Sequence, residues 1–461
     1  MPAERLYYAD SGLTQFTATV TDIRERSRTG GASLWQVALD RSAFYPTSGG
    51  QPHDTGTLIA TAPSGARLEA PVVDAEEDEH GEIWHLTPKP LLAGTQIEGR
   101  IDWGRRLDHM QQHSGQHLLS ALFYQELGAL TVSFHLGDAI STIDLNTESI
   151  EQAQLVNIEQ RANAIVAEGR PIAQRTVPSA DAEILLQSGT LRKLPVRAGD
   201  IRLVVIAGNP AAGAIAGKTA AGAIPGQDAG GAGAIYGEGA PNPDLDVNAC
   251  GGTHVASTSQ IGAVLLRGTE RIRQSVRVSF LCGNRAIAAA RADDALLSQL
   301  GREFSVGRAD LPAALARIKG ETKASAKERQ TLREDLANYH AARLIVEDPL
   351  QNDLRIVRRI FPDRDAEYIK LLASRVARAA PHTIALLAST QQQQAPASVV
   401  VACSQELGRD AGQMLRTALA AFTGRDGGSA TLAQGLVPTD QLDPTLDALE
   451  AQLRNRPVPA G

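Results

Sequence analysis

Apolar and polar residues alternate in short runs over roughly the first 105 residues of the chain. Trp35, Val37 and Leu39 share one side of such a run, which is the pattern of a half-buried strand. Further short strands are predicted near residues 57–60, 72–74, 83–86 and 96–103, with turn residues between them. This spacing predicts a small β-barrel over residues 1–105.

Between residues 106 and 290 the pattern changes to one of helices mixed with strands. Apolar residues at helical spacing surround His113 and predict a helix there. A strand is predicted over residues 131–137, and a helix near residues 149–168. Ser149 and Gln152 form a capping-box signature at the start of that helix. Residues 106–290 are therefore predicted to be a mixed α/β domain.

Within this region the composition changes sharply over residues 207–244, where 26 of 38 residues are Ala, Gly or Pro. Such a segment buries too little apolar surface to offset its ordering entropy, so a flexible insertion is expected. It contains Gly217-Lys218-Thr219, which resembles the end of a phosphate-binding loop. Ala, Gly and Pro follow instead of a helix, so ATP binding is not expected.

The remaining chain is predicted to contain two more parts. Residues 291–346 are charged and helical, which favours a helical spacer over a coiled coil. Residues 347–461 are predicted to form a separate α/β domain with a Gly-rich loop over residues 424–429. The predicted fold class is thus α+β and multidomain: a β-barrel, an α/β domain, a helical spacer and a C-terminal α/β domain.

Composition narrows the class of protein. The chain has 461 residues and a net charge of −7, so any nucleic-acid contact must come from a local basic patch. Three scattered cysteines do not make a disulfide framework. No signal core or membrane-length apolar run is visible, so a soluble, cytoplasmic protein without a membrane contact is expected.

Two short motifs carry candidate chemistry. His113-Ser114-Gly115-Gln116-His117 places two imidazoles four residues apart on one helical face. Cys250-Gly251-Gly252-Thr253-His254 places a thiol and an imidazole across a glycine turn. Histidines at this spacing also occur as ordinary helix residues, so the pairing of the two motifs is what indicates a metal. Three imidazoles and one thiolate fit zinc best among the common metals.

These motifs occur together with two others. The run FYPTSGGQP over residues 44–52 precedes HSGQH, and TVSFHLG over residues 131–137 precedes CGGTH. In this order they resemble the editing domain of alanyl-tRNA synthetases and the freestanding alanyl-tRNA editing proteins of the AlaX group. The spacer and the GRDGGSATLAQG run resemble the C-terminal domain of alanyl-tRNA synthetase, as in the long form of the group. The resemblance covers nearly the whole chain except residues 207–244.

The resemblance implies an aminoacyl-tRNA deacylase that contributes to translation fidelity. Its substrate would be alanine tRNA mischarged with serine or, in some members, glycine. One zinc per chain would be held by His113, His117, Cys250 and His254. Because the chain begins directly with the barrel, without an aminoacylation domain, clearance in trans is expected. A homodimer through the C-terminal region stays open.

Other residues are candidates for substrate contacts. Those expected to sense the serine hydroxyl are Thr47, Ser48, Gly49, Gly50 and Gln51. Ser133 and His135, on one face of the predicted strand, are the candidates for orienting water or the terminal ribose. Candidate RNA contacts are Arg267, Arg271, Arg273 and Arg277, together with Gly427 and Gly428 in the Gly-rich loop.

Two alternatives belong to other classes of protein. The first is a zinc-stabilised RNA-binding protein without catalysis, which would unfold when the metal is removed and would show no deacylation. The second is a phosphoesterase, suggested by the C-terminal domain. Asp108-His109 alone does not supply the aspartate-rich metal motif that this activity requires.

Overall fold

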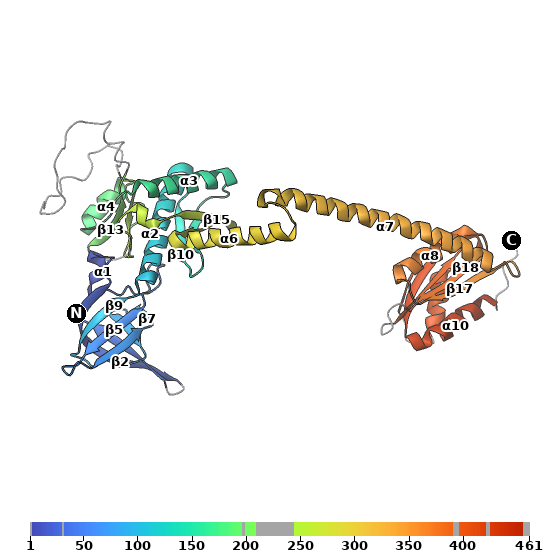
Figure 1. Ribbon diagram of the computed structural model, residues 1–461, viewed down its shortest axis with the longest axis horizontal. Helices are drawn as coiled ribbons and strands as arrows, with labels where there is room; N and C mark the ends of the chain where they lie inside the picture. Colours follow the sequence, from blue (N-terminus) through green and yellow to red (C-terminus); the bar gives the residue numbers. More distant parts are fainter. Residues whose placement is uncertain are drawn as a thin grey trace. The chain divides into compact units, whose positions relative to one another are not determined.

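The computed structural model describes residues 2–29, 32–195, 199–208, 244–390, 396–420 and 425–454 (Figure 1). Its contacts divide the chain into two compact units, Met1–Leu297 and Ser298–Gly461. The predicted insertion over residues 207–244, including Gly217-Lys218-Thr219, lies outside the described residues except at its ends. The predicted α+β class is confirmed, whereas the four-part division of the chain stays a prediction.

The first unit begins with a seven-stranded sheet in the order β6-β5-β9-β2-β3-β8-β7, antiparallel throughout. Its strands are β2 (Gln15–Thr29), β3 (Ala32–Leu39), β5 (Gly56–Thr61), β6 (Arg67–Val72), β7 (Asp74–Glu77), β8 (Ile83–Thr87) and β9 (Gln96–Ile101). A parallel pair of β1 (Glu4–Arg5) and β4 (Arg41–Ser42), with α1 (Leu6–Ala9) between them in sequence, lies beside it.

One detail of this sheet differs from the expected strands. The strand predicted near residues 72–74 is divided between two strands, because Val72 ends β6, Asp74 begins β7 and Val73 is the single residue between them. These two strands form the edges of the sheet and follow each other in sequence, so the sheet must curl to bring them together. No ladder pairs β6 with β7 in the described part of the chain, so a closed barrel stays a prediction.

Helix α2 (Trp103–Leu127) follows the sheet directly and carries the HSGQH motif, as predicted. The Asp102 side chain accepts a hydrogen bond from the Arg105 amide and so ends β9 and starts the helix. Gly128, with φ of 64°, ends it in the left-handed conformation. The helix is buried along most of its length, which holds the histidines in the interior.

A four-stranded sheet packs against α2 in the order β10-β11-β16-β15. Its strands are β10 (Thr131–Leu136), β11 (Ser141–Leu145), β15 (Val264–Ile272) and β16 (Ser275–Cys282). Helix α3 (Gln152–Glu168) covers the shared core through Leu155, Ile158, Ala162 and Ile165. Its capping box joins Glu151 and Gln154, so the predicted Ser149–Gln152 box is wrong: the first helical turn starts later in the chain.

A smaller antiparallel sheet completes the unit with β12 (Ile172–Val177), β13 (Ile201–Ile206) and β14 (Asp246–Ala249). Helix α4 (Ser179–Gln187) packs on its apolar face. Strand β14 leads directly into CGGTH, and η1 (Thr258–Ile261) follows that motif. Helix α6 (Gly283–Glu303) runs on from β16 and contains the boundary between the two units.

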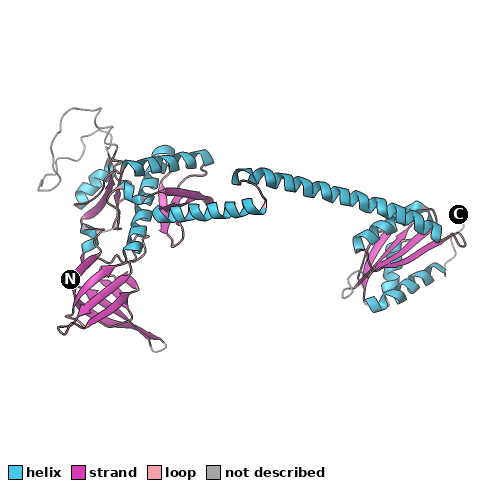
Figure 2. Cartoon of the chain, in the orientation of Figure 1, coloured by secondary structure: helices cyan, strands magenta, loops and turns pink. Residues whose placement is uncertain are grey.

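The second unit contains η2 (Arg308–Asp310), the long helix α7 (Leu311–Glu347) and a five-stranded sheet in the order β17-β18-β19-β21-β20. Figure 2 shows its helices in cyan and its strands in magenta. The strands are β17 (Arg355–Phe361), β18 (Thr383–Ser389), β19 (Ala397–Cys403), β20 (Arg425–Gly428) and β21 (Leu432–Val437). The Gly-rich loop predicted over residues 424–429 is therefore wrong, because four of its residues pair with β21 as an edge strand.

Helices cover both faces of this sheet. The end of α7 and α8 (Ala366–Ala379) pack on one face, and α9 (Ala411–Leu419) and α10 (Leu442–Arg454) on the other. Short turns η3 (Gln405–Leu407) and η4 (Thr439–Gln441) precede α9 and α10. Among the described residues, no helix is both long and apolar enough to span a bilayer.

Candidate metal centre

Two ligand pairs from distant parts of the chain meet in the first unit. One candidate ligand atom from each of His113, His117, Cys250 and His254 lies within 4.8 Å of every other. The Cys250 sulfur is 3.4 Å from His113 Nε2 and 3.3 Å from His254 Nε2. The three imidazoles are buried and the thiol is half-buried. The convergence expected from the two motifs is thus present in the structure.

Glycines inside the two motifs permit this approach. A Cβ atom on Gly252 would lie 2.2 Å from His113 Cε1, so any side chain there would displace a ligand ring. A Cβ atom on Gly115 would lie 2.2 Å from the Cys282 sulfur, so glycine also lets α2 pack closely on β16. These contacts explain why both motifs contain glycine next to their candidate ligands.

The second nitrogen of each imidazole has its own support. His113 Nδ1 donates to Gln51 Oε1 at 2.9 Å, and His254 Nδ1 lies 3.1 Å from the Ser114 hydroxyl. His117 Nδ1 lies 3.4 Å from a carboxylate oxygen of Asp246. Such outer partners orient imidazole ligands and leave Nε2 for a metal.

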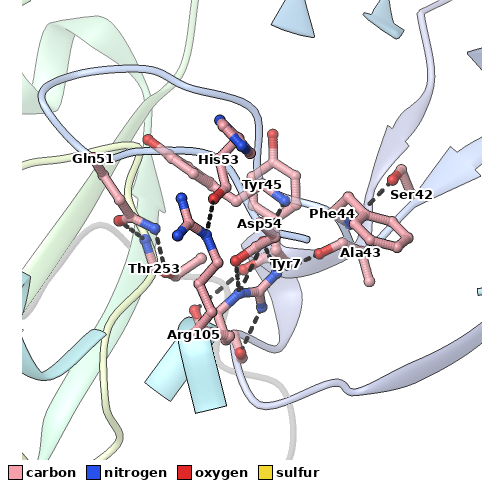
Figure 3. A network of polar contacts seen from close by, with 12 residues as sticks. Tyr7, Ser42, Ala43, Phe44, Tyr45, Gln51, His53, Asp54, Arg105 and Thr253 are labelled. Carbon is pink, nitrogen blue, oxygen red and sulfur yellow. Dashed lines mark hydrogen bonds and ion pairs between the residues drawn. The ribbon is translucent and has the colours of Figure 1, made fainter. Parts of the chain in front are cut away.

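Gln51 reaches the centre from the loop that follows β4. Its Oε1 also accepts from the Thr253 amide at 3.1 Å, and its Nε2 donates to the Thr253 hydroxyl at 2.8 Å (Figure 3). One amide side chain therefore ties the loop, a ligand on α2 and the CGGTH turn together.

A buried ion pair anchors the same loop to the start of α2. Asp54 and Arg106 are both fully buried and paired through Arg106 Nε and Nη2. Asp54 also accepts from the Tyr45 amide at 2.6 Å (Figure 3). Arg106 donates to the carbonyls of Ser11 and Ala43. Because the carboxylate and the guanidinium are both hydrogen-bonded to the surrounding backbone as well as to each other, this pair fixes the loop relative to the histidine helix.

The electrostatics of the four candidate ligands are strongly coupled. Burial and the charge of His113 lower the pKa of His254 to about 3. Burial opposes the charged form of His117, but Asp246 and Cys250 outweigh it and raise the pKa of His117 to about 9. Burial opposes the thiolate as well, yet His113 and His254 hold the pKa of Cys250 well below its ordinary value. The protonation of each of these side chains therefore depends on the charges of the others.

The donor set fits a tetrahedral zinc ion. Bonds of about 2.3 Å to sulfur and about 2.0 Å to nitrogen place these atoms about 3.5 Å apart in a tetrahedral site. The two sulfur–nitrogen distances here, 3.4 and 3.3 Å, are close to that value. A cation would also balance the thiolate and accept the nitrogen lone pairs that crowd the site.

A cavity of about 780 Å³ opens beside three of the ligands, His113, His117 and Cys250. Tyr8, Tyr45, Ser48 and Gly49 form part of its wall, and the 130–134 stretch, including most of β10, forms another part. A third part comes from the 192–195 segment, which carries Arg192 and Lys193. Its size falls within the usual range for small-molecule sites.

Comparison with known proteins agrees with these motifs. The family described as "Threonyl and Alanyl tRNA synthetase second additional domain" matches residues 236–277. The alanyl-tRNA editing protein Aarsd1 of Mus musculus is 28% identical over 382 residues, covering 80% of this chain and 79% of that protein. The alanine–tRNA ligase of Natronomonas pharaonis is 30% identical over 464 residues, covering 98% of this chain but 44% of the ligase. The chain is thus similar to alanyl-tRNA editing proteins over most of their length and to part of alanyl-tRNA synthetases.

Among solved structures, similarity extends to the C-Ala domain of Aquifex aeolicus alanyl-tRNA synthetase. That domain is 20% identical and covers 23% of this chain and 95% of its own, with a TM-score of 0.21. A score this low does not establish a shared fold.

The residues predicted to sense a serine hydroxyl do not all lie at the cavity. Ser48 and Gly49 line the cavity. Gly50, with φ of 84°, packs under the Phe134 ring, which a Cβ atom would approach to 2.9 Å. Thr47 bonds His53, and the Gln51 amide is occupied at the metal centre. Ser48 is thus the hydroxyl-bearing residue of this set that lines the cavity.

The residues predicted to orient water or ribose lie on β10. Ser133 lines the cavity, but its hydroxyl donates to Asp144 at 2.7 Å. His135 is exposed and is not part of the cavity lining. Phe134, between them, lines the cavity and packs 5.2 Å from His113, measured between ring centroids. A catalytic role for the two predicted residues stays a prediction.

The predicted RNA contacts are scattered. Arg267 forms an ion pair with Asp293, and Arg277 forms one with Asp144. These carboxylates partly neutralise the two guanidinium groups. Arg271 and Arg273 lie at the β15–β16 hairpin, where Arg273 has a positive φ of 53°. Gly427 and Gly428 lie in β20 of the second unit. RNA binding by this set stays a prediction.

Sequence reasoning did not identify several residues that shape the centre. Gln116, between the two histidine ligands, lines the cavity, and its amide donates to Ser120 at 2.8 Å. Its position inside HSGQH could have marked it as a site residue. Asp246 and Arg202 carry no such local signal, because tertiary packing alone brings Asp246 to His117 on α2 and Arg202 to the CGGTH turn.

Proposed function

We propose that the protein is a hydrolase that removes serine, and also glycine, from mischarged alanine tRNA in trans, with one zinc per chain. The observation that carries this proposal is the convergence of His113, His117, Cys250 and His254, three of which line a cavity large enough for a small substrate. Homology to alanyl-tRNA editing proteins over most of their length supports both the substrate and the freestanding mode of action.

The four ligands would hold the zinc through three Nε2 atoms and one sulfur. A zinc bound there supplies Lewis acidity, which polarises an ester carbonyl or lowers the pKa of a nearby water. Four protein ligands complete a tetrahedral shell, so the cavity wall has to provide much of the substrate positioning. Gln51, Ser114 and Asp246 contribute indirectly, because they fix the orientation of the imidazole rings.

Discrimination between serine and alanine falls to the cavity side of the 44–52 loop. Ser48 is exposed to the cavity, and the neighbouring Gly49 leaves room for a substrate to approach its backbone. A hydroxyl of the substrate would pair with these polar groups, whereas the alanyl ester would leave them unpaired. The tight Gly50–Phe134 contact holds this loop against β10 and so keeps Ser48 in the cavity wall.

The test compares deacylation of seryl- and alanyl-tRNA(Ala) by the intact protein, Cys250→Ala and Cys403→Ala. Cys403 is buried in β19 of the second unit and serves as the matched cysteine control. Rapid hydrolysis of the seryl ester alone is expected for the intact protein and for Cys403→Ala. Cys250→Ala should lose that activity together with its bound zinc.

Two outcomes would contradict the proposal. Equal activity of Cys250→Ala and the intact protein would remove the metal from the mechanism. No deacylation of any mischarged tRNA, combined with unfolding of the first unit on zinc removal, would favour a zinc-stabilised RNA-binding protein instead.

A further inference from the structure

Arg202 on β13 contacts the metal-binding turn through both its backbone and its side chain. Its carbonyl accepts the Cys250 amide at 3.0 Å, which continues the pairing of β13 with β14. Its Nη1 atom donates to the carbonyls of Cys250 and Gly252 at 2.7 and 2.8 Å. These three bonds hold the backbone on both sides of the candidate sulfur ligand.

The guanidinium lies between this turn and the cavity wall. Its central carbon is 5.1 Å from the centre of the Tyr8 ring, and Tyr8 itself lines the cavity. The Tyr8 hydroxyl is close to the same turn, since a Cβ atom on Gly251 would lie 3.5 Å from it. Tyr8 therefore confines the guanidinium to the position in which it can reach both carbonyls.

This placement of Arg202 lowers the stability of the fold. In the described part of the chain, its Nε and Nη2 atoms are buried without a hydrogen-bond partner. Burial of unsatisfied cationic donors destabilises a fold, and a neutral residue would avoid that cost. A cost of this kind is typical of a residue whose role lies in a functional site rather than in stability.

We infer that Arg202 is a positioning residue of the metal centre. By bonding both carbonyls, it fixes the Cys250–Gly252 turn so that Cys250 and His254 face the two imidazoles of α2. The inference rests on the metal site of the proposed function. It does not depend on which aminoacyl ester the protein hydrolyses.

The experiment measures zinc affinity by competition with a chromogenic chelator for Arg202→Met, Arg202→Lys and Arg175→Met. Arg175 is exposed on the neighbouring strand β12, opposite Leu203, and is the matched control. Affinity should fall by about 10- to 100-fold in Arg202→Met, which is typical when an outer partner of a metal ligand is lost. Arg202→Lys keeps a charged donor and should recover part of the affinity, and Arg175→Met should bind like the intact protein.

A spectroscopic readout reports on the ligand itself. Cobalt(II) bound in place of zinc gives a sulfur-to-metal charge-transfer band, and its intensity should decrease in Arg202→Met as the thiolate loses its position. Unchanged zinc affinity and an unchanged band in a folded Arg202→Met protein would overturn the inference. If that variant does not fold, Arg202→Gln takes its place, and zinc affinity equal to that of the intact protein would have the same meaning.

The same samples separate this inference from the proposed function. An intact protein that binds zinc but does not deacylate seryl-tRNA would contradict the function and leave the role of Arg202 intact. Normal deacylation of seryl-tRNA, with unaltered zinc affinity in the Arg202 variants, would support the proposed function and contradict the role of Arg202.

Discussion

Replacement of Asp54 by alanine tests how the loop that carries Gln51 is held against the histidine helix. Asp54 and Arg106 are both fully buried, and three hydrogen bonds from the guanidinium end on the carboxylate. The substitution leaves the Arg106 charge buried with only the carbonyls of Ser11 and Ala43 as partners. Breaking a buried pair in this way costs about 3–5 kcal/mol.

Urea unfolding followed by tryptophan fluorescence measures this cost selectively. Trp35, Trp84 and Trp103 are the three tryptophans of the chain, and all belong to the first unit. With a urea dependence of about 2–3 kcal/mol per molar, a loss of about 3–5 kcal/mol lowers the midpoint by about 1–2.5 M. The signal of the second unit does not interfere, because that unit contains none of the three tryptophans.

The control is Asp293→Ala, which removes a solvent-exposed ion pair with Arg267 in the same unit. Exposed pairs contribute little, so its midpoint should match that of the intact protein. A midpoint for Asp54→Ala as close to the intact protein as that of Asp293→Ala would refute the reasoning. It would mean that water reaches the Arg106 guanidinium or that the loop relaxes without cost.

Three further predictions use the same unit. Burial lowers the pKa of His85 to about 4, below its ordinary value near 6.5, so the unfolded chain binds the proton more tightly. Stability should therefore fall as pH drops from about 6.5 toward 4, by about 2 kcal/mol at pH 5, and His85→Gln should weaken this dependence in urea titrations. Gly50→Ala should destabilise the unit by about 1–3 kcal/mol more than Gly49→Ala, because both glycines have positive φ but only Gly50 contacts the Phe134 ring. Equal urea midpoints of the two variants would contradict this close packing. Gln51→Ala should lower zinc affinity by about 10- to 100-fold in chelator competition, whereas Thr47→Ala should not, and equal effects would argue against a specific role of the amide.

Local spacing in the sequence predicted much of the centre. Imidazoles at positions i and i+4 of a helix share one face, so His113 and His117 can be paired without knowledge of the fold. Apolar spacing likewise predicted α2 and β3, because the periods of helices and strands are visible within a few residues. Less regular features were missed or misassigned, among them the long strand β2 and the edge strand β20, whose glycines suggested a loop.

Tertiary packing alone decided which residues support the ligands. The sequence by itself assigned Gln51 to the substrate, but the fold brings its amide between His113 and Thr253, where its hydrogen bonds are used. The curled sheet, helix α2 and strand β13 come together only after folding, so the roles of Asp54 and Arg202 have no local pattern. The physical reason is range: side-chain periodicity encodes neighbours along one element, whereas hydrogen-bond partners across elements depend on how those elements pack.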